Sequence, residues 1–202
     1  MGTPMAVDPG ARLTAYPAEL ERTVVLRDGT PARLRPIRPE DQDRLIALYG
    51  RLSRHTAYQR FFSVMQRLPP DWARILATVD YRRRLALLAE VGPEDAPELI
   101  GVARYEPTDR ADTAEVAFTV QDDWQNRGLG TLMLDALLGA AEARGIRRFR
   151  AWVLAGNGRM IDLLTRFTDV VERQTESGVT ELLFQRRAAP RAPRSPDLTD
   201  RR

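Results

Sequence analysis

The amino-acid sequence predicts one mixed α/β (α+β) domain, and three patterns lead to this prediction. Asp28-Gly29 separates two alternating apolar runs near the start of the chain, which is a hairpin signal. Three strand-like runs then follow one another in the middle of the chain. The last of them, at 113–120, leads through a glycine-containing loop into a strongly periodic helix. Periodicity alone leaves the order of the strands in the sheet open.

The first half of the chain contains a hairpin, three short helices and two strands. Asp28-Gly29 joins the hairpin strands, and Arg38-Pro39 begins the first helix, with acidic residues in its first turn. We expect the two hairpin strands at 23–27 and 32–37. The second and third helices are expected at 52–62 and about 68–78, and the two following strands at 85–91 and 99–105.

The second half of the chain alternates strands and helices before it ends in a hairpin. Gly145 ends the helix that follows the glycine-containing loop, and Asn157 opens the next helix. Glu176-Ser177-Gly178 is a turn between the last two strands. The expected strands of this half lie at 113–120, 148–154, about 170–174 and 179–184.

Composition indicates an ordinary globular domain and excludes several kinds of site. The chain has 202 residues, of which 43% are hydrophobic and 29% charged, enough for one domain with a sizeable core. It has no cysteine, which excludes disulfides, thiolate zinc sites and a cysteine nucleophile. His55 is the single histidine, so a multi-histidine metal site is excluded. No metal cofactor is therefore expected.

Charge and hydropathy give no indication of a nucleic-acid or membrane partner. The formal net charge of +3 is too small to suggest nucleic acid, and we interpret the use of arginine for all 31 basic residues as compositional bias. No apolar run approaches the roughly 18 residues of a membrane span, and no secretory signal opens the chain. A cytoplasmic location is the resulting expectation.

Both ends of the chain are predicted to lie outside the folded domain. Residues 1–20 are rich in proline, glycine and alanine without periodicity, which is typical of a flexible arm. Residues 187–202 hold three prolines among arginines and should form a disordered tail. The folded domain is expected at 21–186.

The loop at 125–131, Gln-Asn-Arg-Gly-Leu-Gly-Thr, is the clearest candidate for ligand binding. Two glycines at the mouth of a helix let backbone N–H groups approach an anion, and the helix N-terminus adds partial positive charge. A dinucleotide fingerprint would need a third glycine, and a Walker loop would need a lysine, of which the chain has none. What remains suits a phosphate or pyrophosphate, with an ordinary turn before an amphipathic helix as the alternative.

The Gln-x-x-Gly-x-Gly pattern after a strand resembles the acetyl-CoA pyrophosphate loop of the GNAT-type N-acetyltransferase superfamily. The stretch at 52–62, with its Ser53, Thr56, Tyr58 and Arg60, looks like a segment of the bacterial Pat-group protein-lysine acetyltransferases. The resemblance covers about residues 22–186. It implies a single GNAT fold, with a mixed sheet of about seven strands and helices on both faces.

The resemblance also implies a set of residues that bind acetyl-CoA or another short acyl-CoA. Backbone N–H groups of the loop would hold the pyrophosphate. Main-chain groups of Phe118 and Val120 would contact the pantetheine where two parallel strands splay apart, and the N–H of Val120 would polarise the thioester carbonyl. Asn157 would contact the pantetheine or the phosphates, with a helix N-cap as the alternative. The implied loop residues are Gln125, Asn126, Arg127, Gly128, Leu129, Gly130 and Thr131.

Glu115 is the candidate general base. It stands in an otherwise apolar strand, and a lysine amine, whose pKa is near 10.4, must lose a proton before it attacks a thioester. A carboxylate in a partly apolar cleft has a raised pKa that suits this task. In the Pat group a glutamate on the corresponding strand has this role, and Glu115 matches it in position. The alternative is a glutamate on the solvent face of an alternating strand.

Tyr58 and Arg60 are the candidate acceptor-site residues, because this helical region lines the acceptor site in GNAT folds. The alternative for Tyr58, Phe61 and Phe62 is packing of the helix onto the sheet, and we interpret His55 as a surface residue. Two positions depart from the family pattern. Leu164 occupies the place of a tyrosine that acts as general acid in many GNAT enzymes, and Thr168-Asp169 replaces a usual Gly-Phe.

Three functions remain open at this point. The first is an acetyl-CoA-dependent N-acetyltransferase that acts on a protein lysine, with an acyl-CoA synthetase as an example of an acceptor, through direct attack in a ternary complex. The second is acetylation of a small amine. The third is a non-catalytic acyl-CoA-binding regulatory module. A homodimer is compatible with each of them.

Overall fold

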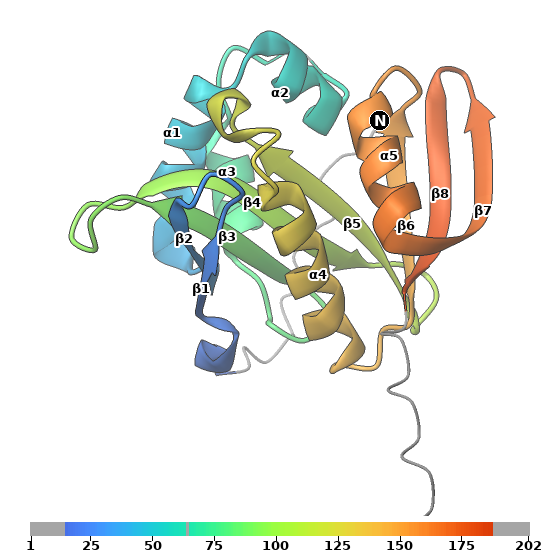
Figure 1. Cartoon of the computed structure of the whole chain (residues 1–202), viewed down its shortest axis with the longest axis horizontal. Helices are drawn as coiled ribbons and strands as arrows, with labels where there is room; N and C mark the ends of the chain where they lie inside the picture. Colours follow the sequence, from blue (N-terminus) through green and yellow to red (C-terminus); the bar gives the residue numbers. More distant parts are fainter. Residues whose placement is uncertain (1–14, 64, 188–202) are drawn as a thin grey trace, which may run out of the picture.

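The computed structural model describes residues 15–63 and 65–187, which form one open eight-stranded sheet with five α-helices packed on it. The sheet has the strand order β1-β2-β3-β4-β5-β6-β8-β7 (Figure 1). The strands are β1 (Arg22–Val25), β2 (Pro31–Pro36), β3 (Leu85–Val91), β4 (Glu98–Pro107), β5 (Thr113–Val120), β6 (Arg148–Leu154), β7 (Thr168–Glu176) and β8 (Val179–Arg186). The helices are α1 (Gln42–Arg51), α2 (Arg54–Phe61), α3 (Pro70–Ala77), α4 (Leu129–Glu142) and α5 (Gly158–Phe167).

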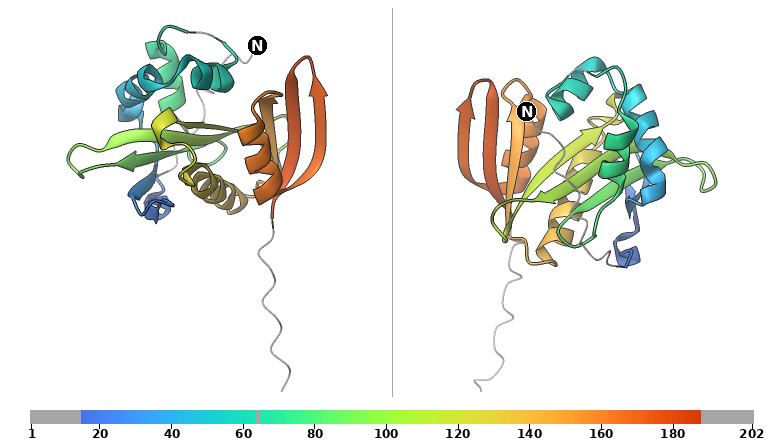
Figure 2. Two further views of the ribbon diagram at one scale, coloured as in Figure 1. Left: turned by 45° about the horizontal axis from the view of Figure 1, so that its top comes forward. Right: turned by 180° about the vertical axis from the view of Figure 1, so that it is seen from behind.

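Every neighbouring pair of strands is antiparallel except β5 and β6, which are parallel and connected through α4. Helices α1, α2 and α3 lie on one face of the sheet, and α4 lies on the other (Figures 1 and 2). Helix α5 packs against β7 and α4. This arrangement confirms the predicted mixed α/β fold with helices on both faces.

The predicted elements occur in the predicted order, with two differences. The sheet has eight strands rather than about seven, and β7 is longer than the expected 170–174 because it begins at Thr168, directly after α5. Most of β7 is exposed and polar, so it carries little hydrophobic periodicity. A hydrogen bond from Thr168 Oγ1 to the carbonyl oxygen of Leu164 (2.6 Å) joins the end of the helix to the strand without the usual Gly-Phe.

The N-terminal boundary also differs from the prediction. Within the predicted flexible arm, Ala18–Leu20 form a 3-10 turn, and the Tyr16 ring packs edge-on against Tyr81 at a centroid distance of 5.7 Å. Residues 16–20 are therefore in contact with the folded domain, because the Tyr16 ring packs on a residue distant in sequence. The remaining part of the arm and nearly all of the predicted tail, 1–14 and 188–202, lie outside the described residues.

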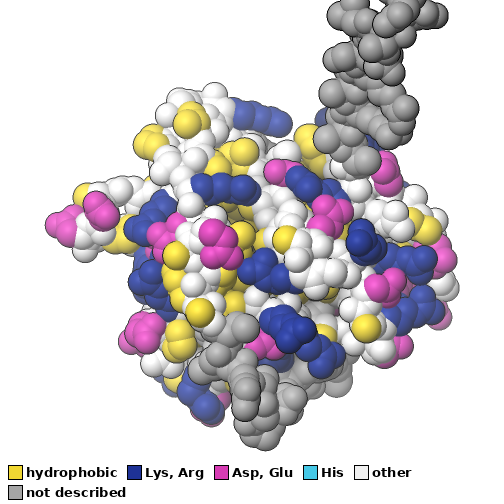
Figure 3. All heavy atoms as spheres, turned by 90° about the horizontal axis from the view of Figure 1, so that it is seen from below, with side chains coloured by type: hydrophobic (Ala, Val, Ile, Leu, Met, Phe, Trp, Pro, Cys, Tyr) yellow, Lys and Arg dark blue, Asp and Glu magenta, His cyan; other side chains and the backbone are white. Residues whose placement is uncertain are grey.

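The core fills both sides of the sheet. The seven residues of β3 are all buried, as expected for a central strand covered on both faces. Phe149 of β6 and Phe184 of β8 are fully buried and stack at a centroid distance of 5.9 Å. The described helices include none that is both long and apolar enough to cross a membrane. On the face shown in Figure 3, arginine side chains are interspersed with acidic side chains.

A buried ionic cluster fixes the entry into α1. Arg35 of β2 is 6% exposed and forms a bidentate interaction with Asp41, with N–O distances of 2.6 and 2.8 Å. The Nε of Arg35 also donates to Glu90 of β3 at 2.9 Å. Arg44 of α1 donates to the same Glu90 oxygen. The cluster therefore joins β2, β3 and the start of α1, and each buried charge depends on its partners.

The R35M substitution should lower the free energy of unfolding by about 3–5 kcal/mol, because it removes the buried cation that both carboxylates share and leaves them with Arg44 alone. Urea denaturation followed by circular dichroism measures the change. R33M is the matched control, since Arg33 lies two positions earlier on the same strand and its side chain is 43% exposed in its ion pair with Glu21. R33M should cost less than about 1 kcal/mol. Equal losses for the two variants would contradict a special role of the buried cluster.

Candidate functional site

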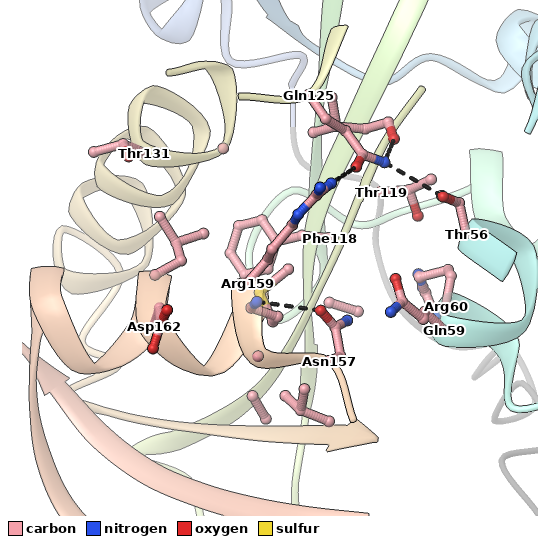
Figure 4. A pocket seen from close by; sticks show the side chains of 18 of the residues that line it. Thr56, Gln59, Arg60, Phe118, Thr119, Gln125, Thr131, Asn157, Arg159 and Asp162 are labelled. Atoms are coloured by element: carbon pink, nitrogen blue, oxygen red, sulfur yellow. Dashed lines mark hydrogen bonds between the residues drawn. The ribbon is translucent and has the colours of Figure 1, made fainter. Parts of the chain in front are cut away.

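A cleft of about 660 Å³ lies where β5 and β6 separate. Helix α2 forms one wall, and the N-terminal ends of α4 and α5 form the opposite wall (Figure 4). All but three of the predicted site residues line this cleft. The three that do not are Tyr58, Arg127 and Leu129.

The separation of β5 and β6 creates the cleft. Their parallel pairing covers only three positions and ends at Glu115, which pairs with Arg150. Beyond this point β5 stays paired with β4 through Val120. The β6-facing side of β5 therefore presents main-chain groups without a neighbouring strand, and such groups need partners from a ligand or water.

The phase of the β4–β5 ladder decides which main-chain groups face this gap. The N–H of Gln121 donates to the carbonyl oxygen of Ile100 at 2.9 Å. Because hydrogen-bonded pairs alternate along an antiparallel ladder, the main-chain groups of Phe118 and Val120 point away from β4 and towards the gap. The side-chain amide of Gln125 donates to the carbonyl of Val120 at 3.0 Å, which is consistent with this direction. The N–H groups of Phe118 and Val120 thus face the gap, as the resemblance implies.

The loop at 125–131 forms an anion-binding cradle. Asn126 and Gly128 have positive φ angles of 63° and 87°, which turn the chain into the first turn of α4. The N–H groups of residues 126–130 donate to no acceptor in the described part of the chain. These five donors and the α4 dipole suit a pyrophosphate.

Two contacts with the β1–β2 hairpin hold the loop in place. The N–H of Arg27 donates to the carbonyl of Arg127 at 2.9 Å, and the Arg127 guanidinium pairs with Asp28 at 2.9 Å. At Gly128, a Cβ atom would lie 3.1 Å from the Cγ of Arg27, so a larger residue would push against the hairpin. Arg127 is therefore a contact between the loop and the hairpin, and its side chain is directed away from the cradle.

Gln125 connects both walls of the cleft. Its Nε2 also donates to Thr56 of α2 at 3.3 Å, and its Oε1 accepts a hydrogen bond from Arg159 of α5 at 3.0 Å (Figure 4). The sequence analysis did not identify Thr56 and Arg159 as partners of Gln125. Their positions in the sequence carry no signal for these contacts, because the three residues lie on elements that only the folded chain brings together.

Asn157 caps helix α5. Its side-chain oxygen accepts a hydrogen bond from the N–H of Met160 at 3.2 Å, which confirms the N-cap alternative. The Asn157 side chain lies beside the cleft (Figure 4), and the cap uses only its oxygen. A contact between its amide nitrogen and a bound acyl-CoA stays a prediction.

Glu115 lies at the point where the two strands separate, on the face of the sheet that carries α2. Its side chain has access to solvent, yet the walls of the cleft surround it. Burial raises the pKa of Glu115, while the nearby Arg60 and Arg150 oppose this rise and Glu106 adds to it. The side chain has no hydrogen bond or ion pair within the described residues. A carboxylate of this kind is suited to accept a proton.

Helix α2 is anchored by Asp122, and its side chains divide into two groups. The Asp122 carboxylate accepts hydrogen bonds from the N–H and Oγ of Ser53 and from Oγ1 of Thr56, at 2.6–2.9 Å. Arg60 lines the cleft, as predicted. Tyr58 is 43% exposed and belongs neither to the cleft lining nor to the core.

The neighbours of Tyr58 and Arg60 behave differently from one another. Phe61 packs edge-on against Tyr49 of α1 at a centroid distance of 5.4 Å, which agrees with the packing alternative. Phe62 is 38% exposed and lines the cleft, so packing does not describe it. His55 is exposed at the cleft edge. Trp152 of β6 is a further exposed cleft residue that the sequence analysis did not identify.

Comparisons with known proteins agree with this geometry. The model of the acetyltransferase (GNAT) family matches residues 41–168. The acetyltransferase Pat of Mycolicibacterium smegmatis is 33% identical over 180 residues, which cover 88% of this chain and 52% of that protein. The chain thus spans about half the length of this relative.

Solved structures give the same result. The GNAT domain of S. lividans PAT superimposes with a TM-score of 0.77 at 39% identity, covering 84% of this chain and 99% of that domain. A structure from Salmonella typhimurium, solved with its cofactor acetyl-CoA, shares the fold with a TM-score of 0.59 at 18% identity, over 80% of this chain and 98% of that one. The match of the family model over more than half of the chain shows that this protein belongs to the GNAT acetyltransferase family and is an acyl-CoA-dependent N-acetyltransferase.

Proposed function

We propose that the protein transfers an acetyl group from acetyl-CoA to the side-chain amine of a lysine in an acceptor protein. The observation that carries this proposal is the position of Glu115. Glu115 is the last residue of β5 that pairs with β6. There the gap between β5 and β6 meets the wall of the cleft that α2 forms. A base at this junction reaches an amine that approaches the thioester from the α2 side.

The donor would bind across the gap. The five free N–H groups of residues 126–130 would hold the pyrophosphate, and the pantetheine amides would pair with the main chain of β5 in the manner of an added strand. The N–H of Val120 would donate to the thioester carbonyl oxygen as negative charge develops on it. The sequence offers no cysteine for an acyl-enzyme, so direct attack in a ternary complex is the route that fits.

The acceptor amine would pass its proton to Glu115, directly or through a water molecule. The amine nitrogen would then attack the thioester carbon to form a tetrahedral intermediate. The nitrogen would lose its second proton to water as the carbon–sulfur bond breaks, which gives the amide and releases the CoA thiolate. Leu164 is fully buried and cannot act as the general acid that a tyrosine provides elsewhere in the family. A thiol has a pKa near 8.5, so the thiolate is a fair leaving group without such help.

A protein acceptor is supported by two observations. The chain matches nearly the whole GNAT domain of S. lividans PAT at 39% identity. Two large side chains that line the cleft, Trp152 and Phe62, are 44% and 38% exposed, which is typical of a surface that contacts a second protein. Small-amine acetylation is the alternative that the following experiment distinguishes.

A labelling experiment identifies the class of acceptor without interference from self-acetylation on lysine, because the chain contains no lysine. Incubation with radiolabelled acetyl-CoA and a panel of acyl-CoA synthetases should label the synthetases on lysine and leave the enzyme without ε-amine label. A panel of small amines assayed under the same conditions is the comparison. Label on small amines alone would contradict the protein-acceptor proposal.

The E115Q substitution should lower kcat by about 10²–10⁴-fold, because general-base catalysis typically contributes that much. The Kd for acetyl-CoA, measured by calorimetry, should change less than about twofold, since the cradle is intact. Glu172 on β7 is exposed and lies outside the cleft lining, so E172Q is the matched control and should keep wild-type turnover. Unchanged turnover in E115Q would refute the assignment of the base.

The pH dependence should also identify Glu115. Burial raises the pKa of this group in the folded protein above its ordinary value of 4.5, so ionised Glu115 disappears as the pH falls through that raised pKa. Below it, log(kcat/KM) of the wild type should fall by one more unit per pH unit than that of E115Q. The same sign makes ionisation of Glu115 unfavourable for folding, so the Tm of E115Q at pH 7 should be no lower than that of the wild type. Parallel profiles would contradict the prediction.

A further inference from the structure

The cleft contains a guanidinium without a partner. Arg60 projects from α2 towards the cleft and is half-buried (Figure 4). Within residues 15–63 and 65–187 it forms no hydrogen bond and no ion pair. The Cζ atom of its guanidinium lies 5.0 Å from the centroid of the Phe61 ring. Partial burial of a cation without an ion-pair partner costs free energy, which the fold has to offset.

Three other arginines around the cleft have partners. Arg159 donates to Gln125 at 3.0 Å. Arg104 of β4 pairs with Glu106 and donates to the carbonyl of Leu76 at 3.2 Å. Arg150 of β6 lies 2.8 Å from a carboxylate oxygen of Glu181. Among these four arginines, Arg60 is the one whose guanidinium has neither a hydrogen bond nor an ion pair within the described residues.

Arg60 and Glu115 line the same cleft but do not touch. They form no ion pair within 4.0 Å, although each affects the titration of the other. The remaining charged and titratable groups around them are Arg104 and Glu106 on β4, Arg150 on β6 and His55 on α2. An acceptor amine that enters the cleft beside Glu115 would therefore also come under the electrostatic influence of Arg60.

We propose that Arg60 selects the neutral form of the acceptor amine. Its uncancelled positive charge, across the cleft from Glu115, disfavours an ammonium group in the space between them and so favours the form that can attack the thioester. This inference rests on the proposed acetyl-transfer reaction, but it holds for a protein lysine and for a small amine alike.

The charges and the residue type agree with this role. Two cations in a cleft of low dielectric repel each other, so a bound lysine loses its proton more readily. Burial and Arg104 lower the pKa of Arg60 to about 10, so its guanidinium is still charged at neutral pH. Burial also keeps the pKa of Glu115 raised despite Arg60, so the base retains its affinity for the proton. A lysine at position 60 would itself be an acceptor, whereas a guanidinium is a cation that does not attack thioesters.

The experiment is the pH dependence of acetyl transfer in a single turnover, with acetyl-CoA and acceptor saturating, for the wild type and R60Q. The pH at which the rate falls on the acid side should be about one unit higher in R60Q than in the wild type, because the repulsion between Arg60 and the ammonium form of the acceptor is removed. The shift should shrink in high salt. R54Q is the matched control, since Arg54 is exposed on the same helix outside the cleft lining, and its limb should coincide with that of the wild type.

A second comparison separates the amine from the base. In the E115Q background the residual limb reports the acceptor amine alone, and adding R60Q should still move it upwards. No shift there would mean that Arg60 acts only through Glu115, which would overturn the proposal. If R60Q keeps the acid-side pH dependence of the wild type but has a raised KM for the acceptor, the proposal is also overturned. Arg60 would then bind an anionic part of the acceptor.

Failure of this inference and failure of the proposed function give different results. If E115Q turns over like the wild type, the proposed base is wrong whatever R60Q does. If E115Q collapses while R60Q keeps the wild-type limb, only the role of Arg60 is wrong. Thermal melting of R60Q and of R60M, which keeps the apolar length of the side chain, shows whether a loss of activity reflects unfolding.

Discussion

The short parallel pairing between β5 and β6 is the constraint on which the site depends. Three paired positions are enough to align the strands, and the separation after Glu115 leaves the main chain of β5 without a partner on one side. Such groups would be costly to leave dry, so the gap is open to water or to a ligand with amide groups. The cleft at this separation is lined both by the first turn of α4 and by α2, so in the proposed reaction the donor and the acceptor would meet there.

A polar hydrogen-bond network holds the two walls of the cleft in a fixed relative position. Asp122 follows β5 and binds Ser53 and Thr56 at the start of α2, while Gln125 binds Thr56 and Arg159. The hydrogen-bond network thus ties the segment that forms the anion cradle to the helix that carries Arg60. Movement of α2 relative to the cradle would break several hydrogen bonds to a charged group, each of which contributes about 1.5–3 kcal/mol.

Arginine has two contrasting roles in this chain. In the cluster at the start of α1, Arg35 neutralises two buried carboxylates and holds three elements together. In the cleft, Arg60 has no such partner, and its charge can act on whatever enters. The two cases differ in whether the guanidinium forms ion pairs. The paired charge of Arg35 holds the fold together, and the unpaired charge of Arg60 contributes to the electrostatic potential of the cleft.

The sequence by itself determined the elements and the cradle. Alternation at 113–120 put Glu115 on the opposite face from Phe118, and the glycines after Arg127 located the helix mouth, because these are local properties of strands and turns. Only the tertiary structure decided where β5 and β6 part, and that Arg60 enters the cleft while Tyr58 does not. It also packed Tyr16 against Tyr81 and joined Gln125 to Arg159. These outcomes depend on contacts between residues far apart in the chain, and periodicity reports only which face of its own element a side chain occupies.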